Sequence, residues 1–316
     1  MTTEPTPHAV GDVTGATLAP QTAPPTLLAF LADVRAQLDA ELDRRLRPPA
    51  DDPGRLFEAM HYAATGPGKR FRPAIVLAAA EAVGATREAA LPAAAAVEML
   101  HAYTLVHDDL PAMDNDDFRR GRPTNHKVFG EAIAILAGDA LLTEAFAVTS
   151  RCPAPPAVLV QVLRELASAV GAAGMVGGQV IDIEATGNKV DLELLRRLHG
   201  KKTGALLAVS VCAGARLGGA GESAVAGLRT YAEALGLAFQ IIDDVLDVTA
   251  DLQTLGKDPG SDREAGKTTY VDLLGVDGAR RQADEVMTAG IAALAPLGTA
   301  AEPLRALGRY TVERRS

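Results

Sequence analysis

The stretch that decides the fold is V-H-D-D-L-P-A-M-D-N-D-D-F-R-R-G-R, from Val106 to Arg122. It holds five aspartates within ten residues, followed by three arginines: Asp108, Asp109, Asp114, Asp116, Asp117, Arg119, Arg120 and Arg122. Carboxylates this close repel one another, so a folded site needs cations among them. Hard oxygen ligands favour Mg²⁺, which waters and substrate phosphates usually complete, and arginine forks suit phosphate oxygens. The stretch therefore predicts a site for metal ions and phosphate groups.

Pro111 interrupts the helix that leads into this stretch. Apolar residues at helical spacing predict a helix from Thr86 to Leu110. In a continuous helix the proline ring would clash with the carbonyl of His107, so the helix must open at the acidic residues. The opening lets Asp114 fold back toward Asp108, which a regular helix does not permit at a spacing of six.

A second acidic run, F-Q-I-I-D-D-V-L-D, spans Phe239 to Asp247. At about 100° per residue, Asp243 and Asp247 share a helical face with Gln240 and Gly236. An apolar stripe lies beside that face, formed by Leu235, Phe239, Ile242 and Leu246. A solvated surface explains either acidic run alone. Two runs, each ending an apolar helix pattern and each followed by Lys or Arg, favour a shared site.

The two runs resemble the two aspartate-rich motifs of the trans-isoprenyl diphosphate synthases, the polyprenyl synthetase family. D-D-x-x-x-x-D begins at Asp108 and D-D-x-x-D begins at Asp243. Further segments match in the expected order between Leu27 and Leu274: G-K-R-F-R-P (Gly68–Pro73), H-A-Y (His101–Tyr103), G-G-Q (Gly177–Gln179), K-T-G (Lys202–Gly204), L-G-K (Leu255–Lys257) and G-K-T-T (Gly266–Thr269). The resemblance implies an all-α isoprenoid synthase fold, a bundle of about ten to thirteen helices around a central apolar cavity.

Composition agrees with a helical protein that has a large core. The chain has 316 residues, 48% of them hydrophobic, with 4% aromatic residues and no Trp. No run of about 18 uninterrupted apolar residues occurs, so we expect no membrane span. The N-terminus lacks the features of a signal peptide, and Cys152 and Cys212 are too few for a disulfide framework or a cysteine metal site. We therefore expect a cytoplasmic protein.

The net charge of −9 argues against nucleic acid as a partner, because nucleic acid requires a basic patch. The same charge opposes a diphosphate substrate at long range. Screening beyond about 8–10 Å lets local ions and arginines outweigh that field.

Residues 1–25 are rich in Thr, Pro, Ala and Gly and predict a disordered tail, with a single domain over 26–316. No alternating strand or fixed-period repeat is found, and a polar loop is expected over Leu252–Thr269. Helical periodicity predicts an all-α domain with helices over Leu27–Leu46, Asp52–Ala64, Pro73–Val83, Thr86–Leu110, Glu131–Ser150, Pro156–Ile183, Asp191–Leu198, Thr203–Leu217, Glu222–Val248, Val276–Ala295 and Ala300–Glu313.

The resemblance implies Mg²⁺-dependent transfer of an allylic prenyl group, from dimethylallyl or geranyl diphosphate, onto isopentenyl diphosphate. It implies that Asp108 and Asp114 hold two Mg²⁺ and Asp243 a third. Further carboxylates near the metals would be Asp109, Asp244 and Asp247. The allylic diphosphate would contact Arg119, Lys202, Thr203, Gln240, Lys257 and Lys267. The rest of the cavity must be apolar, because water would quench the carbocation.

Isopentenyl diphosphate keeps its diphosphate, so its site should be basic without metal ligands. By the resemblance this site comprises Lys69, Arg72, His101 and Arg120. Ordinary turn charge also explains the first two, and a core histidine explains His101. Gln179 and Asp182 face the cavity in one interpretation, and in another the glycines before them serve only close helix packing.

Other functions remain as alternatives. The pair His107–Asp108 is compatible with an HD-type metal phosphohydrolase, although that interpretation leaves the distal D-D-x-x-D unexplained. A cyclising or head-to-head terpenoid enzyme also uses aspartate motifs, but G-K-R-F-R-P and the double arginine favour elongation. A non-catalytic prenyltransferase subunit would have lost aspartates that are present here.

Product length is decided by the floor of the pocket, where the resemblance assigns Tyr103 and Thr104. Tyr103 resembles the pattern of bacterial farnesyl diphosphate synthases, whereas the small Thr104 leaves room for a longer chain. We expect mainly farnesyl diphosphate, with a geranylgeranyl diphosphate synthase as the alternative. The resemblance also implies a homodimer, and the run Leu91–Leu100 is apolar on nearly every side, which suits a core or an interface.

Overall fold

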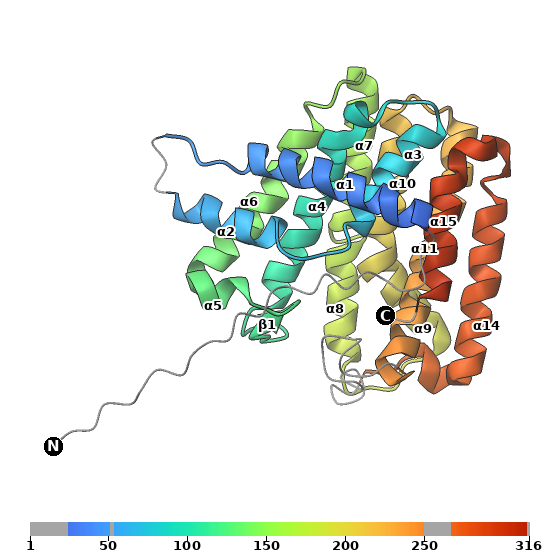
Figure 1. The fold of residues 1–316 in the computed structure, drawn as a ribbon. Coiled ribbons are helices and arrows are strands. Elements are labelled where there is room, and N and C mark those ends of the chain that lie inside the picture. The colour runs from blue at the N-terminus through green and yellow to red at the C-terminus, as the bar shows by residue number, and fades with distance from the viewer. Residues whose placement is uncertain (1–24, 51–53, 250–266, 315–316) are drawn as a thin grey trace.

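The computed structural model describes residues 25–50, 54–249 and 267–314. Within these ranges the chain is almost entirely helical, and α1 crosses α3 and α4 at the front of the view in Figure 1. The elements are α1 (Pro25–Arg45), α2 (Arg55–Ala64), α3 (Phe71–Ala82), α4 (Arg87–Asp108), β1 (Phe118–Arg119), β2 (Arg122–Pro123), α5 (Asn125–Phe129), α6 (Glu131–Thr149), α7 (Pro156–Val170), α8 (Met175–Ala185), α9 (Leu192–His199), the π-helix η1 (Gly200–Gly204), α10 (Ala205–Leu217), α11 (Glu222–Thr249), α14 (Tyr270–Ala292), the 3₁₀-helix η2 (Ala295–Ala301) and α15 (Glu302–Glu313). The expected all-α fold is confirmed.

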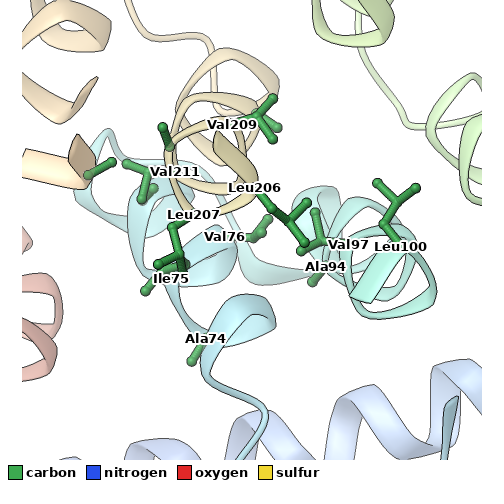
Figure 2. Packing of buried hydrophobic residues seen from close by; sticks show 14 of the residues in the cluster. Ala74, Ile75, Val76, Ala94, Val97, Leu100, Leu206, Leu207, Val209 and Val211 are labelled. Carbon is green, nitrogen blue, oxygen red and sulfur yellow. The ribbon is translucent and has the colours of Figure 1, made fainter. Parts of the chain in front are cut away.

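Small residues allow the central helices α3, α4 and α10 to approach closely (Figure 2). Ile75 of α3, Val97 of α4 and Leu207 of α10 are buried in the same cluster. Gly214 touches the backbone of α3: a Cβ added there would lie 2.1 Å from the carbonyl oxygen of Val76. Any larger residue at Gly214 would separate α10 from α3, so this core depends on alanine and glycine as much as on large apolar side chains.

The helix leading into the acidic stretch opens where Pro111 predicts. α4 ends at Asp108, and the chain turns so that the amide of Asp114 donates to the carbonyl of Asp108 at 2.8 Å. Asn115 completes the turn with a φ of 55°, in the left-handed region that Asn tolerates better than most residues. The predicted return of Asp114 toward Asp108 is therefore confirmed.

A short hairpin follows the acidic stretch, and the sequence pattern did not predict it. β1 and β2 are antiparallel, with Phe118 opposite Pro123 and Arg119 opposite Arg122. The two turn residues, Arg120 and Gly121, both have positive φ, 52° and 75°. Positive φ at both central positions defines the tight turn that matches the twist of paired strands. Strands of two residues are too short to show alternation in the sequence.

Other boundaries also differ from prediction. The helix expected over Pro156–Ile183 divides into α7 and α8, because the chain leaves helical geometry between Gly171 and Gly174. α14 begins at Tyr270, six residues before the expected Val276, with a non-helical Gly275 (φ 68°) inside it. Of the tail predicted over 1–25, residues 1–24 lie outside the described residues, and Pro25 is the first residue of α1. The predicted start of the second helix at Asp52 and most of the loop expected over Leu252–Thr269 also lie outside the described residues.

Three helical segments are long and apolar enough to cross a membrane by length and composition: Arg87–Asp108, Glu131–Thr149 and Pro156–Ala185. The first is largely enclosed by protein, with 67% of its apolar window buried, against 39% and 28% for the others. Exposed apolar side chains are concentrated on α6 and α8: Ile135, Leu136, Val176, Val180 and Ile183. These two helices therefore present apolar surface that the described chain does not cover.

Candidate active site

The first acidic motif divides into paired and unpaired carboxylates. Asp109 is buried and accepts a hydrogen bond from Arg119 Nε at 2.6 Å, and Arg119 also contacts Asp116 at 3.2 Å. Asp108 and Asp114 form no ion pair with another described residue. Burial raises the pKa of Asp108 to about 6, and Asp114 adds to the shift although Lys202 opposes it. Asp108 and Asp114 are thus the carboxylates of this motif that no cation of the described chain pairs with, which leaves them to an added cation.

The second acidic motif lies near the C-terminal end of α11 and also divides by role. Asp243 has a side chain 40% exposed, whereas Asp244 and Asp247 are buried. Asp244 accepts a hydrogen bond from the backbone amide of Tyr270 at 2.7 Å, which ties α11 to the first residue of α14. Asp243 is therefore the most exposed carboxylate of this motif, and its role as a metal ligand stays a prediction.

A cleft of about 140 Å³ brings together distant parts of the predicted allylic site. It is lined by Lys202 and Thr203 from η1, Gln240 from α11, and Lys267. Asp182 of α8 forms an ion pair with Lys202 at 2.5 Å and a longer one with Lys267 at 3.7 Å. Although burial alone would raise it, Lys202 holds the pKa of Asp182 below its usual range. Lys257, predicted for the same site, lies outside the described residues.

Helix α8, which carries the G-G-Q segment, combines a residue that faces the cavity with a glycine that serves close helix packing. Asp182 lines the cleft, which supports the view that this face of α8 is turned to the cavity. Gly178 also serves close packing, because a Cβ there would lie 2.4 Å from the backbone nitrogen of Lys202. The glycine thus lets α8 lie directly against η1.

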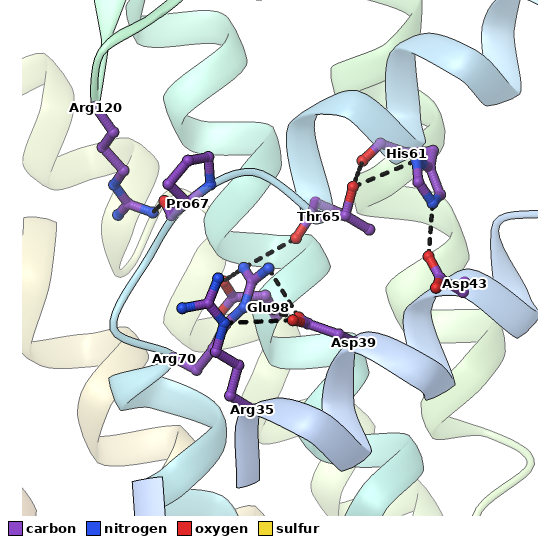
Figure 3. A network of polar contacts seen from close by, with 10 residues as sticks. Arg35, Asp39, Asp43, His61, Thr65, Pro67, Arg70, Glu98 and Arg120 are labelled. Atoms are coloured by element: carbon purple, nitrogen blue, oxygen red, sulfur yellow. Dashed lines mark hydrogen bonds and ion pairs between the residues drawn. The ribbon is translucent and has the colours of Figure 1, made fainter. Parts of the chain in front are cut away.

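The residues predicted for the metal-free site lie close enough to influence one another's pKa values. Arg120, at the tip of the hairpin, has its Nη2 3.3 Å from His101 Nε2. Its Nη1 donates to the carbonyl of Pro67 at 2.9 Å (Figure 3). Lys69 and Arg72 flank the same turn, and burial lowers the pKa of both. The Nε of Arg72 is buried without a hydrogen-bond partner among the described residues. A buried cation with an orphaned donor suits an anionic ligand.

The predicted pocket-floor residues lie one turn before the acidic motif. Tyr103 is 6% exposed, and its ring lies edge-on to His107 with centroids 5.7 Å apart. The Nε2 of His107 lies 3.0 Å from the carbonyl oxygen of Ile135 on α6. Thr104 is half-buried, and its hydroxyl donates back to the carbonyl of His101 at 2.7 Å. Tyr103 thus packs against His107 of its own helix, and His107 in turn contacts α6.

Sequence reasoning missed Arg314, which follows α15. Its guanidinium forms an ion pair with Asp243, donates to the carbonyl of Phe239 at 3.1 Å, and lies 4.2 Å above the Phe239 ring. It also acts with burial to lower the pKa of Lys69. One arginine near a chain end carries no pattern that separates it from surface charge, so nothing in the sequence could have identified it.

The donor chemistry of the site fits Mg²⁺. Among the described residues no three His, Cys, Asp or Glu side chains are grouped closely enough to enclose an ion. Asp108, Asp114 and Asp243 nevertheless offer hard oxygen ligands from two elements. The raised pKa of Asp108 shows that the folded site disfavours uncompensated negative charge. Such ligands can hold cations that are completed by water and by a ligand's phosphates.

The chain belongs to the polyprenyl synthetase family, whose profile matches residues 53–292. It is 46% identical over 261 residues to a farnesyl diphosphate synthase of Bacillus subtilis (strain 168), covering 82% of this chain and 88% of that protein. It is 44% identical over 270 residues to the chloroplastic geranylgeranyl pyrophosphate synthase 7 of Arabidopsis thaliana, covering 84% and 78%. Among solved structures, an FPP/GFPP synthase from Zymomonas mobilis superposes with a TM-score of 0.81 at 41% identity, covering 91% and 99%.

Proposed function

We propose that this protein is a short-chain trans-prenyltransferase that joins isopentenyl diphosphate head-to-tail to dimethylallyl or geranyl diphosphate, giving mainly farnesyl diphosphate. The observation that carries the proposal is the presence of two separate cationic sites around the end of α4. In one, Lys202 and Lys267 line the cleft and Lys202 acts on the pKa of Asp108, and we assign Asp114 and Asp243 to the same site. The other has Lys69, Arg72, His101 and Arg120. The reaction needs one site with carboxylates for metal ions, where a diphosphate leaves, and one site with cations alone, where the other diphosphate is retained.

At the first site the chain's own residues bind and orient the allylic diphosphate. Lys202 and Lys267, now neutralised by Asp182, would turn to the phosphate oxygens, and Thr203 and Gln240 lie in the same cleft. Asp108, Asp114 and Asp243 would hold three Mg²⁺, which when bound neutralise the charge that develops on the leaving group. Arg119 reaches the cleft only after it loosens its contacts to Asp109 and Asp116.

At the second site Lys69, Arg72 and Arg120 would bind isopentenyl diphosphate without metal. Burial lowers the pKa of all three, so an arriving diphosphate would stabilise their charged forms. Burial, with the arginines around it, also holds the pKa of His101 well below its usual range. The ring is therefore neutral at physiological pH and can contact the diphosphate through a hydrogen bond.

The HD-type phosphohydrolase alternative is less well supported by the geometry. His107, the histidine that prompted it, has its Nε2 at Ile135 of α6, with Asp139 3.9 Å away. A geranylgeranyl diphosphate synthase remains the second candidate, because the small Thr104 on the Asp108 face leaves space that a longer chain would need. A non-catalytic subunit has no observation in its favour.

We also propose a cytoplasmic homodimer. On α8, Val176, Val180 and Ile183 are each about half exposed and follow one another at spacings of four and three, so they form one apolar face. Ile135 and Leu136 on α6 are similarly exposed. Burial of these faces against a second copy would remove them from water. Light scattering at micromolar protein concentration should give twice the chain mass.

Incubation of the purified protein with isopentenyl diphosphate and each allylic primer, followed by sizing of the products, tests the proposal. We expect mainly fifteen-carbon products with some twenty-carbon product. Products of twenty carbons alone would favour the second candidate, and phosphate release without any prenyl product would refute prenyl transfer.

A further inference from the structure

Arg70 lies in the middle of the basic turn G-K-R-F-R-P but does not join the cation cluster formed by its neighbours. Its backbone is left-handed, with a φ of 50°, and the residue is only 3% exposed. A non-glycine residue adopts this conformation at a cost in free energy, so the surroundings must hold it there. Lys69 and Arg72, on either side, belong to the expected isopentenyl diphosphate site.

The guanidinium of Arg70 connects four helices (Figure 3). Its Nη1 donates to Glu98 of α4 at 2.6 Å and to the carbonyl of Ala64, the last residue of α2, at 3.0 Å. Its Nε donates to Asp39 of α1 at 3.1 Å. Since Arg70 is also the residue that caps α3, one side chain fixes the start of α3 against α1, α2 and α4. Its Nη2 lies 3.0 Å from Asp39 Oδ1 in an ion pair without forming a hydrogen bond, so Glu98 and Asp39 together neutralise the guanidinium.

Glu98 links this network to the cluster electrostatically. It is 4% exposed and precedes His101 by three residues on α4. Burial lowers the pKa of Arg72 and of Arg120, and the charge of Glu98 is the strongest influence acting against that shift in both. One buried carboxylate therefore serves as counter-charge to Arg70 and as support for the two arginines that face the substrate.

The turn is also held from the side of the site. Arg120 donates to the carbonyl of Pro67 at 2.9 Å, and a Cβ on Gly68 would lie 2.6 Å from its Nη1. A larger residue at Gly68 would push this guanidinium from its present position. The turn from Pro67 to Arg70 is thus fixed between Arg120 on one side and the contacts of Arg70 on the other.

We propose that Arg70, through Glu98 and Asp39, is a positioning residue for isopentenyl diphosphate: it does not touch the substrate but fixes the turn that presents Lys69 and Arg72. The inference rests on the proposed function, because it concerns the second of the two diphosphate sites. It distinguishes Arg70 from the other cations of the motif, which would contact the ligand directly.

The test compares Arg70→Lys and Glu98→Gln with the control Arg87→Lys. Arg87 also joins α4 to α1 and α3, through ion pairs with Asp33 and Glu81, but lies away from the cluster. Each protein is assayed for KM toward isopentenyl diphosphate, KM toward geranyl diphosphate, kcat and melting temperature. Isopentenyl diphosphate binding without an allylic partner is measured by titration calorimetry. Asp39→Asn, at a carboxylate one-third exposed, supplies a milder variant that should fold if the others do not.

We expect Arg70→Lys and Glu98→Gln to raise KM and Kd for isopentenyl diphosphate by about tenfold or more, because small displacements of binding groups are costly. The KM for geranyl diphosphate should change by less than about twofold, and Arg87→Lys should change neither KM although it lowers the melting temperature. Asp39→Asn should shift the same constants in the same direction by less. Suppose that the wild-type enzyme makes a prenyl product. If the two variants Arg70→Lys and Glu98→Gln then raise both KM values equally, or raise neither, the positioning role is refuted while the proposed function stands. If the wild-type protein makes no prenyl product, both are refuted.

Discussion

The guanidinium of Arg314 forms an ion pair with the carboxylate of Asp243, the most open aspartate of the second motif. The arginine is 7% exposed and the aspartate side chain 40% exposed, so the pair lies at the edge of the site. Because Asp243 is a proposed Mg²⁺ ligand, Arg314 and a metal ion would compete for the same carboxylate.

Arg314→Ala should therefore lower the Mg²⁺ concentration that gives half-maximal activity. We expect a decrease of about two- to fivefold, the scale of a partly exposed ion pair worth roughly 0.5–1 kcal/mol. Arg309→Ala is the matched control, since Arg309 is on α15, the helix that Arg314 follows, but pairs with Glu302. A Mg²⁺ requirement that is unchanged in Arg314→Ala would show that the pair does not limit metal binding.

Asp108→Ala should reduce turnover by at least about 10²-fold, as expected when a charge-stabilising group is removed. The metal-free protein should remain folded and should melt no earlier than wild type, because burial and Asp114 already disfavour the ionised Asp108 carboxylate. Asp117→Ala is the control: Asp117 lies in the same loop but is 62% exposed and paired with Lys127. Near-normal turnover in Asp108→Ala, or an equal loss in Asp117→Ala, would contradict the assignment.

His199 should contribute to acid destabilisation. Burial lowers the pKa of His199 from 6.5 to about 4, so the unfolded chain binds a proton over that range and the folded chain does not. Stability is therefore lost as pH falls from 6.5 toward 4. The melting temperature of the wild-type protein should therefore fall between pH 6.5 and pH 4. In His199→Gln this fall should be smaller by a few degrees, since one kcal/mol corresponds to about 2–4 °C in a domain of this size. Parallel melting curves for the two proteins across this pH range would disprove the contribution.

Tyr103→Ala should open space for about one isoprene unit and shift the products toward twenty carbons or more. Thr104 lies one turn before Asp108, and Thr104→Phe should shorten the products to ten or fifteen carbons. Product chromatography measures both. If only Thr104→Phe changes the distribution, Tyr103 does not form the side wall, and if neither does, the floor lies on another helix.

Much of the fold follows from local rules that act within short stretches. Apolar spacing at 3.6 residues predicts the long helices, and the ring of Pro111 predicts where α4 ends and why Asp114 returns to Asp108. The pairing of two distant acidic runs identifies the carboxylates of the site. The resemblance supplies the order of the remaining motifs and the roles of the cations.

Other features depend on contacts that no local pattern encodes. The hairpin that presents Arg120 has strands too short to alternate, and its turn is marked only by Gly121. The role of Asp244 in holding Tyr270 depends on a contact between residues 26 positions apart. The contacts of Arg70 with Glu98 and Asp39 join residues on other helices. Such roles become visible only when the elements are placed together.

The central claim is that one diphosphate leaves while the other is retained at a separate site. Isopentenyl diphosphate and geranyl diphosphate, each labelled in turn on its terminal phosphorus, test this claim directly in single turnovers with Mg²⁺ and with excess chelator. The account predicts that label from geranyl diphosphate appears as free pyrophosphate, that label from isopentenyl diphosphate stays in the prenyl product, and that neither occurs with chelator. Release of the isopentenyl label, or full turnover in the presence of chelator, would contradict it.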